Sequence, residues 1–78
     1  MSRHEPLMGV FAHLIGEEMA SQDLSQAEFA RRTGASTKHV NQFLGTRTGV
    51  SLPMLDYWAH VLGCRWEVRL RPVDEVPE

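Results

Sequence analysis

The 78-residue sequence predicts one mainly α-helical domain of four to five helices, followed by a single C-terminal β-strand. Two observations predict this class. Apolar residues recur at three- and four-residue spacing up to about residue 63, and from there to residue 71 they alternate with charged residues. A chain this short buries only about 60% of its unfolded surface, so it has room for one core. We therefore expect a helical domain (residues 1–63), a strand (64–72) and a flexible acidic tail (73–78).

The first helix is expected at about residues 6–20. Pro6 suits its first turn, where a missing backbone N–H leaves no bond unmade. Gly9 and Gly16 each weaken the helix by roughly 1 kcal/mol relative to alanine, so packing has to hold it. The face expected to be buried consists of Leu7, Met8, Val10, Phe11, Leu14, Ile15 and Met19.

Two shorter helices are expected on either side of Gly34. Ser25 and Glu28 have the spacing of a capping box, in which each side chain accepts from the other residue's backbone N–H. Gly34 can adopt the left-handed conformation that ends a helix, and Ser36 is a better cap than Ala35 for the next one. The two helices would span residues 25–33 and 36–44, and would bury Ala27, Phe29, Ala30, Val40 and Phe43.

A fourth helix is expected after a loop at residues 45–50. Ser51 is its expected cap, Pro53 falls in its first turn, and Gly63 ends it. Its apolar stripe is formed by Leu52, Leu55, Trp58, Ala59 and Leu62, so all four helices would share one core.

The last segment has the pattern of a half-buried strand that ends at Pro72. A single strand cannot satisfy its own backbone groups, and no other segment of the chain has a strand pattern. The nearest available partner is the same strand of a second copy, which predicts a homodimer joined by an antiparallel β-ribbon. The interface residues would be Trp66, Val68 and Leu70, packed against the helices, with Arg65, Glu67, Arg69 and Arg71 outside and Cys64 as a small core residue.

The composition excludes several classes of protein. One cysteine excludes an intramolecular disulfide, and no apolar run approaches the roughly 20 residues needed to span a bilayer. The N-terminus lacks a signal-peptide pattern, so a cytoplasmic location is expected. The four histidines are not spaced as metal ligands, and Cys64 has no orienting partner or phosphate-binding loop, so we expect no metal, no cofactor and no catalysis.

The charge of the chain is segregated. The formal net charge is −2, but residues 25–50 carry four basic residues against Glu28 alone, a local charge of +3. Because a local patch decides nucleic-acid binding more than the total charge does, this segment is the candidate for a polyanionic partner. Its basic residues are Arg31, Arg32, Lys38 and Arg47.

The pair of helices around Gly34 has the features needed to place its second helix in a DNA major groove. Ala30 is small where the helices must approach closely, and Val40 and Phe43 anchor the second helix from one side. The residues expected on its other side have the reach and the hydrogen-bonding groups to contact base edges: Thr37, Lys38, Asn41 and Gln42.

From Leu24 to Gly63 the chain resembles the Cro/phage-repressor helix-turn-helix family, also called the xenobiotic-response-element family. The resemblance is carried by Gln26, Ala30, Gly34, Ser36, Val40, Phe43 and Gly45, and by the later stretch SLPMLDYWAHVLG (51–63). The loop at 45–49 departs from the commoner Asn-Gly pair of the family. The C-terminal strand is absent from many members but resembles the dimerising ribbon of some antitoxin-like ones.

The resemblance implies roles for individual residues. Gln26 would bond a backbone phosphate and brace the helix at residues 36–44, while Thr37, Lys38 and Gln42 would face bases, with Asn41 as a further candidate. Ser36 and the loop residues Thr46, Arg47 and Thr48 would contact phosphates. Arg31 and His39 are further phosphate candidates by location, although Arg31 and Arg32 could equally be a solvated helix face.

These features predict a sequence-specific, dimeric transcriptional repressor that binds double-stranded DNA at an inverted-repeat operator. Two biologies remain open: a phage Cro- or repressor-like switch protein, and an antitoxin-like autoregulator that also binds a toxin or another regulatory protein. The alternative from a different class is a protein-interaction adaptor, which uses the first helix or the strand edge, and the net negative charge favours it.

Overall fold

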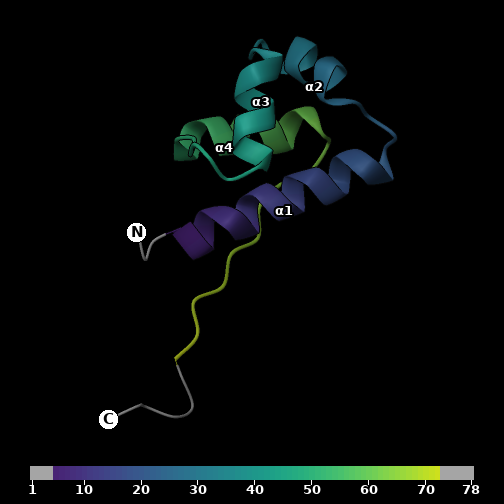
Figure 1. The fold of residues 1–78 in the computed structure, drawn as a ribbon. Coiled ribbons are helices and arrows are strands. Elements are labelled where there is room, and N and C mark those ends of the chain that lie inside the picture. The colour runs from purple at the N-terminus through teal and green to yellow at the C-terminus, as the bar shows by residue number, and fades with distance from the viewer. Residues whose placement is uncertain (1–4, 73–78) are drawn as a thin grey trace.

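A computed structural model describes residues 5–72 of the chain, which form four helices and, within that range, no strand (Figure 1). The predicted mainly helical class is confirmed, and the predicted helices all form, with ends that differ by one or two residues. The acidic tail expected at residues 73–78 lies outside the described residues. The helices are α1 (Glu5–Ser21), α2 (Gln26–Thr33), α3 (Thr37–Leu44) and α4 (Leu52–Val61).

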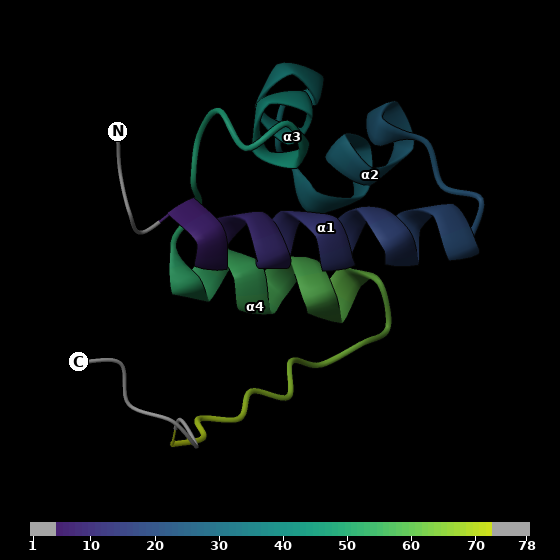
Figure 2. The ribbon, with the colours of Figure 1, turned by 60° about the horizontal axis from the view of Figure 1, so that its bottom comes forward.

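The long helix α1 divides the molecule. Both views show α2 and α3 on one side of α1, with α4 packed alongside, while residues 64–72 leave the end of α4 and extend away from the helices on the side opposite α2 and α3 (Figures 1 and 2). The helix pair α2–α3 and the extended segment at residues 64–72 therefore lie on opposite sides of the molecule.

The core is built around Trp58 of α4, which is 1% exposed. Its ring meets the ring edges of Phe29 and Phe43 at centroid distances of 5.3 and 5.2 Å. Such edge-to-face pairs each add about 0.5–1.5 kcal/mol beyond the burial of their area. Because these three residues come from α4, α2 and α3, one aromatic cluster fixes the positions of three helices. The remaining buried residues are Ala12, Ile15, Met19, Ala30, Val40, Leu55, Ala59 and Leu62.

Several residues expected in the core lie at the surface. Leu7, Val10 and Leu14 of α1 are 44–62% exposed, and Leu52 of α4 is 71% exposed. Ala27 of α2 is exposed as well. The apolar stripe of α1 is wider than the strip that the other helices cover, and Leu52 and Ala27 lie in the first turns of their helices. The periodicity predicted the helices correctly but overestimated how much of each was covered.

Three serines cap three helices, as predicted. The Oγ atoms of Ser25, Ser36 and Ser51 accept from the backbone N–H three residues later, at 3.1, 3.0 and 3.2 Å. The capping box at Ser25 is only half formed, however. The Glu28 carboxylate accepts from Arg31 and Arg32 of its own helix, since charge-assisted bonds to guanidinium groups are stronger than one to a backbone N–H.

Residues 64–72 are extended but unpaired. No backbone group of residues 65–72 bonds to another backbone group of the described chain. Trp66 anchors the segment: its Nε1 donates to Leu55 O (2.8 Å), and its ring meets the edge of Phe11 at 5.2 Å. Val68 and Leu70 are 78% and 97% exposed. In the single chain the expected strand therefore lacks a partner, and pairing with a second copy remains a prediction.

Cys64, expected in the core, is exposed instead. It follows Gly63, whose positive φ of 76° turns the chain away from the helices. Partial desolvation and the nearby Glu18 carboxylate raise the pKa of its thiol, so the thiol is less reactive than its exposure suggests.

None of the helices in the described range is both long enough and apolar enough to cross a bilayer.

Candidate nucleic-acid interface

The turn between α2 and α3 sets the geometry of the candidate interface. Gly34 has a φ of 79°, in the left-handed region, and its N–H and that of Ala35 both donate to Ala30 O, at 2.9 and 3.1 Å. Ser36 then caps α3 with its Oγ. Three residues are therefore enough to end one helix and start the next in a new direction. Ala30, 2% exposed, leaves room for this close approach.

The helix α3 has one fully buried side and one polar, open side. Val40 and Phe43 are both 0% exposed, whereas Thr37, Lys38 and Asn41 are exposed and Gln42 is half-buried. Since buried residues three apart fix the rotation of a helix, the polar side cannot turn inward without emptying the core. The structure thus brings together at the surface all four residues predicted to contact bases.

A hydrogen bond joins α2 to α3 at this surface. Asn41 Nδ2 donates to Gln26 Oε1 at 3.2 Å, which sets the orientation of both amides. The Gln26 Nε2 group is left as a donor at the N-terminal end of α2, where the helix dipole also favours an anion. Asn41 keeps its carbonyl oxygen and one N–H. The bond makes Asn41 as much a link between the helices as a candidate base reader.

The two arginines of α2 are tied to one carboxylate. Arg31 donates through Nε and Nη2, and Arg32 through Nε, to Glu28; the Arg31 Nε–Oε1 and Arg32 Nε–Oε2 distances are 3.2 and 2.9 Å. Arg31, and then Arg32, lower the pKa of the Glu28 carboxyl, and Glu28 in turn raises the pKa of Arg31. The positive charge of α2 is therefore smaller than the count of arginines predicts. The i, i+3 and i, i+4 spacing carried this signal in the sequence.

Lys38 and Arg47 carry the unpaired positive charge of this surface. Within residues 5–72, neither makes an ion pair, and both are exposed. Lys38 lies in the first turn of α3 and Arg47 lies just beyond its last turn, so the two charges bracket the helix. Both charges are therefore available to a polyanionic partner at this surface.

The remaining phosphate candidates are more constrained than expected. His39 is half-buried, with its ring 5.8 Å from that of Trp58, and so it is held by the core. Ser36 Oγ already accepts from His39 N. In the loop, Thr46 Oγ1 donates to Gly45 O (2.6 Å) and Arg47 N donates to Gln42 O (2.8 Å), which folds the loop against the end of α3. Thr48 is half-buried beside it.

Comparisons with protein-family models, with curated proteins and with solved structures gave no match to this chain.

Proposed function

We propose that the chain is a sequence-specific, dimeric DNA-binding transcriptional repressor of the Cro/phage-repressor helix-turn-helix type. One observation carries the proposal: Val40 and Phe43, each 0% exposed, hold α3 so that its polar side stands open directly after the Gly34 turn. In this arrangement α3 enters the major groove, and α2 crosses the phosphate backbone.

The residues divide into those that read bases and those that bind phosphates. Lysine pairs with guanine, amides pair with adenine and threonine with several bases, so Thr37, Lys38 and Gln42 supply specificity, with Asn41 at the edge of this group. Arg47 and the Gln26 amide donor supply phosphate contacts and hence most of the affinity. The phosphate-binding group also includes Ser36, His39, Thr46 and Thr48. Arg31 joins it once its guanidinium is released from Glu28.

Dimerisation would make the operator an inverted repeat. Each subunit reads one half-site, and the two half-sites lie about 34 Å apart on one face of the duplex. The exposed segment supports this part of the proposal, because the backbone groups of residues 65–72 bond to no other backbone group of the described chain and the Val68 and Leu70 side chains are exposed.

Selection of bound duplexes from a random pool tests the proposal. The expected result is an enriched inverted repeat whose half-sites are recovered by the wild-type protein and lost by a protein with alanine at Thr37, Lys38 and Gln42. All three residues lie at the surface of α3, so the variant is expected to fold. A mobility shift with random duplex at low salt is the companion measurement, and no shift there would overturn the proposal.

The alternative function is that of a protein-interaction adaptor. The observation in its favour is the exposed apolar row Leu7, Val10 and Leu14 on α1, which the other helices leave uncovered. An adaptor would show no duplex binding at low salt and would retain its partner when Lys38 and Arg47 are replaced. Within the repressor proposal, a neighbouring toxin gene would favour an antitoxin-like autoregulator, and a phage early region would favour a Cro-like switch.

A further inference from the structure

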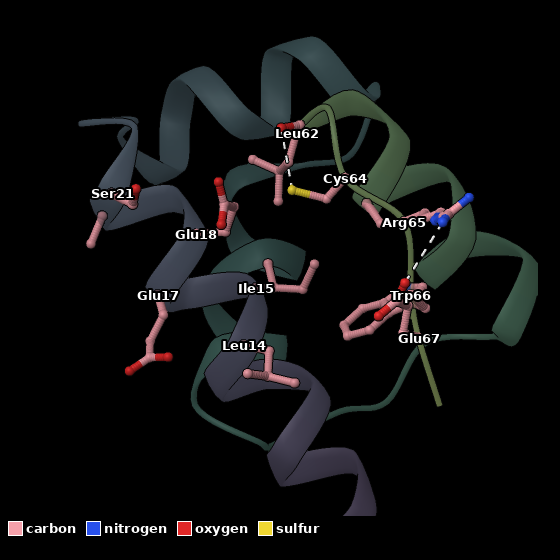
Figure 3. A pocket seen from close by; sticks show the side chains of 12 residues that line it. Leu14, Ile15, Glu17, Glu18, Ser21, Leu62, Cys64, Arg65, Trp66 and Glu67 are labelled. Atoms are coloured by element: carbon pink, nitrogen blue, oxygen red, sulfur yellow. Dashed lines mark hydrogen bonds and ion pairs between the residues drawn. The ribbon is translucent and has the colours of Figure 1, made fainter. Parts of the chain in front are cut away.

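A groove of about 820 Å³ lies between α1 and the first residues of the extended segment (Figure 3). Leu14 and Ile15 of α1 form its apolar floor, and Trp66 faces them from the other wall. Two carboxylates, Glu17 and Glu18, stand on the α1 side. The groove therefore fits a segment that presents an apolar side chain together with positive charge.

Residues 69–72 of the same chain form such a segment, but they cannot reach the groove of their own subunit. Leu70 is 97% exposed, and neither Arg69 nor Arg71 makes an ion pair within residues 5–72. The segment runs outward from Trp66 and away from the helices (Figures 1 and 2), so its outer half cannot fold back onto the groove beside its inner half. The end of the sequence, which contains Asp74 and Glu75, has the same sign of charge as the groove and is a poor occupant.

We propose that this groove is the binding site, or seat, for residues 69–72 of a second copy. The extended segment of each subunit (residues 64–72, here called the arm) then lies with its outer half in the groove of the other subunit. The inference deepens the dimer of the proposed function and rests on it for the presence of a second copy. This occupant complements the groove, because its apolar side chain matches the apolar floor and its two flanking arginines match the acidic side. Its backbone N–H and C=O groups also need a strand beside them.

The alternation of charged and apolar residues limits the possible registers, and the placement of Leu70 beside Trp66 chooses among them. Opposite residues of an antiparallel pair share a face, so an odd shift would place charged side chains against apolar ones. Pairing centred on Glu67 places that carboxylate against its own copy and Arg65 against Arg69. Pairing centred on Val68 instead places Glu67 opposite Arg69 of the partner subunit and Trp66 opposite the partner's Leu70.

The register centred on Val68 also fits the groove. Residues 64–67, which line one wall of the groove, then lie opposite residues 72–69 of the partner subunit. The partner's Leu70 enters between Trp66 and the floor of α1. The partner's Arg71 lies opposite Arg65, and the Glu17 and Glu18 carboxylates across the groove offset that repulsion.

Charge reversal tests the register through the composition of the dimer. Glu67→Arg alone places arginine against arginine twice in each dimer, and Arg69→Glu alone places glutamate against glutamate twice. In an equimolar mixture both pairs become attractive. Each single variant turns two attractive cross-strand pairs into repulsive ones, so it should dimerise at least about fourfold more weakly than wild type, and the mixture should form a heterodimer.

Sedimentation velocity without DNA, together with native mass spectrometry of the mixture, gives the measurement. Each single variant measured alone is the control. If Arg69→Glu alone dimerises as tightly as wild type, or if the mixture associates no more tightly than the single variants, the register and the seat are wrong. A wild-type protein that is monomeric at every concentration would overturn both the seat and the dimer.

The floor of the groove has its own test. Leu14→Arg puts a charge where the partner's Leu70 is to sit and should weaken dimerisation, whereas Leu7→Arg, on an exposed leucine of α1 outside the groove, should not. Equal effects of the two would contradict the seat. Binding of a single half-site by the monomeric variants is measured in parallel. Half-site binding by a wild-type protein that stays monomeric would contradict this inference and leave the base-reading role of α3 standing, and a wild-type dimer that binds no DNA would contradict the repressor proposal alone.

Discussion

Glu28 controls how much of the positive charge of α2 is available. Arg31 and Arg32 both donate to its carboxylate, so the three side chains together carry a single positive charge. The lowered pKa of Glu28 means that these ion pairs contribute stability above the ordinary carboxyl value of 4.5 and lose it as the pH falls through the depressed folded-state value. At neutral pH the carboxylate is fully charged and competes with any phosphate for both arginines.

Replacement of Glu28 by glutamine should therefore strengthen binding to random duplex. The neutral amide releases Arg31 and Arg32, and each new phosphate contact should steepen the dependence of log K on log salt by about 0.9. Fluorescence anisotropy over a salt series measures this slope. Asp56→Asn, on the exposed surface of α4, is the control of equal charge change. If the two variants give the same slope, the effect is one of net charge and the role assigned to Glu28 is wrong.

Lys38 and Arg47 should differ in the kind of loss they cause. Lys38→Ala removes a proposed base contact, so base preference should relax at one position of each half-site, at a cost of about 1–3 kcal/mol for the preferred base. Arg47→Ala removes a phosphate contact, so all sequences should weaken alike and the salt slope should fall by about one unit. Binding to a set of single-base operator variants separates the two. A selective loss from Arg47→Ala would reverse its assignment.

At the scale of an element, the turn between α2 and α3 requires glycine at position 34 because of the backbone conformation there, and not because a side chain would lack room. A Cβ added to Gly34 would meet no atom within 4 Å, but the φ of 79° disfavours any L side chain. Gly34→Ala should therefore lower the free energy of unfolding by roughly 1 kcal/mol, and Gly34→Asn should cost less because asparagine tolerates this conformation.

Gly16 provides the matched control for the turn. It lies inside α1 with no positive φ, and its added Cβ would be 3.6 Å from a Leu44 side-chain carbon, an ordinary contact. Gly16→Ala should therefore raise the free energy of unfolding, by up to about 1 kcal/mol. Urea titration of both variants gives the two signs. If both variants lose stability, then steric packing, and not the backbone conformation at Gly34, determines whether a side chain is tolerated in the turn.

The sequence predicted best what local chemistry decides. Helix starts at Ser25, Ser36 and Ser51 and the turn at Gly34 depend on residues within one turn of the chain, and all four are in place. Which apolar side chains are buried depends on how the helices pack against one another, and no local pattern contains that information. Leu52, predicted to be buried from its spacing, is therefore exposed. The exposed polar side of α3 was predictable because two buried residues on one helix determine where its other side points.

Two features of the candidate site escaped sequence reasoning for the same cause. The family resemblance implied that Gln26 braces α3 but not that Asn41 is its partner, because this bond spans fifteen residues and requires α2 and α3 to be in contact. The pairing of Glu28 with two arginines had a visible spacing, but a capping box was an equally good interpretation of the same glutamate. Where one side chain has two possible partners, only the geometry decides between them.

At the scale of the whole molecule, α3 and the extended segment that lines one wall of the groove lie on opposite sides of α1 (Figures 1 and 2). A second copy can therefore occupy the groove without covering α3. This separation also sets a strict condition on the dimer. A two-fold axis through the paired arms brings both α3 surfaces to one side only if it runs nearly parallel to the direction in which α3 faces.

The spacing of the half-sites tests that condition. A dimer that meets it should bind best when the half-site centres lie 10–10.5 base pairs apart, about 34 Å along one face of the duplex. An insertion of five base pairs turns one half-site to the far side of the duplex, so the affinity of the full operator should fall to that of a single half-site. The inserted operator keeps both base sequences, which makes it its own control for base contacts. An affinity that does not change with spacing would mean that the subunits bind independently, and the geometry of the paired arms would then be wrong even if α3 reads the bases as proposed.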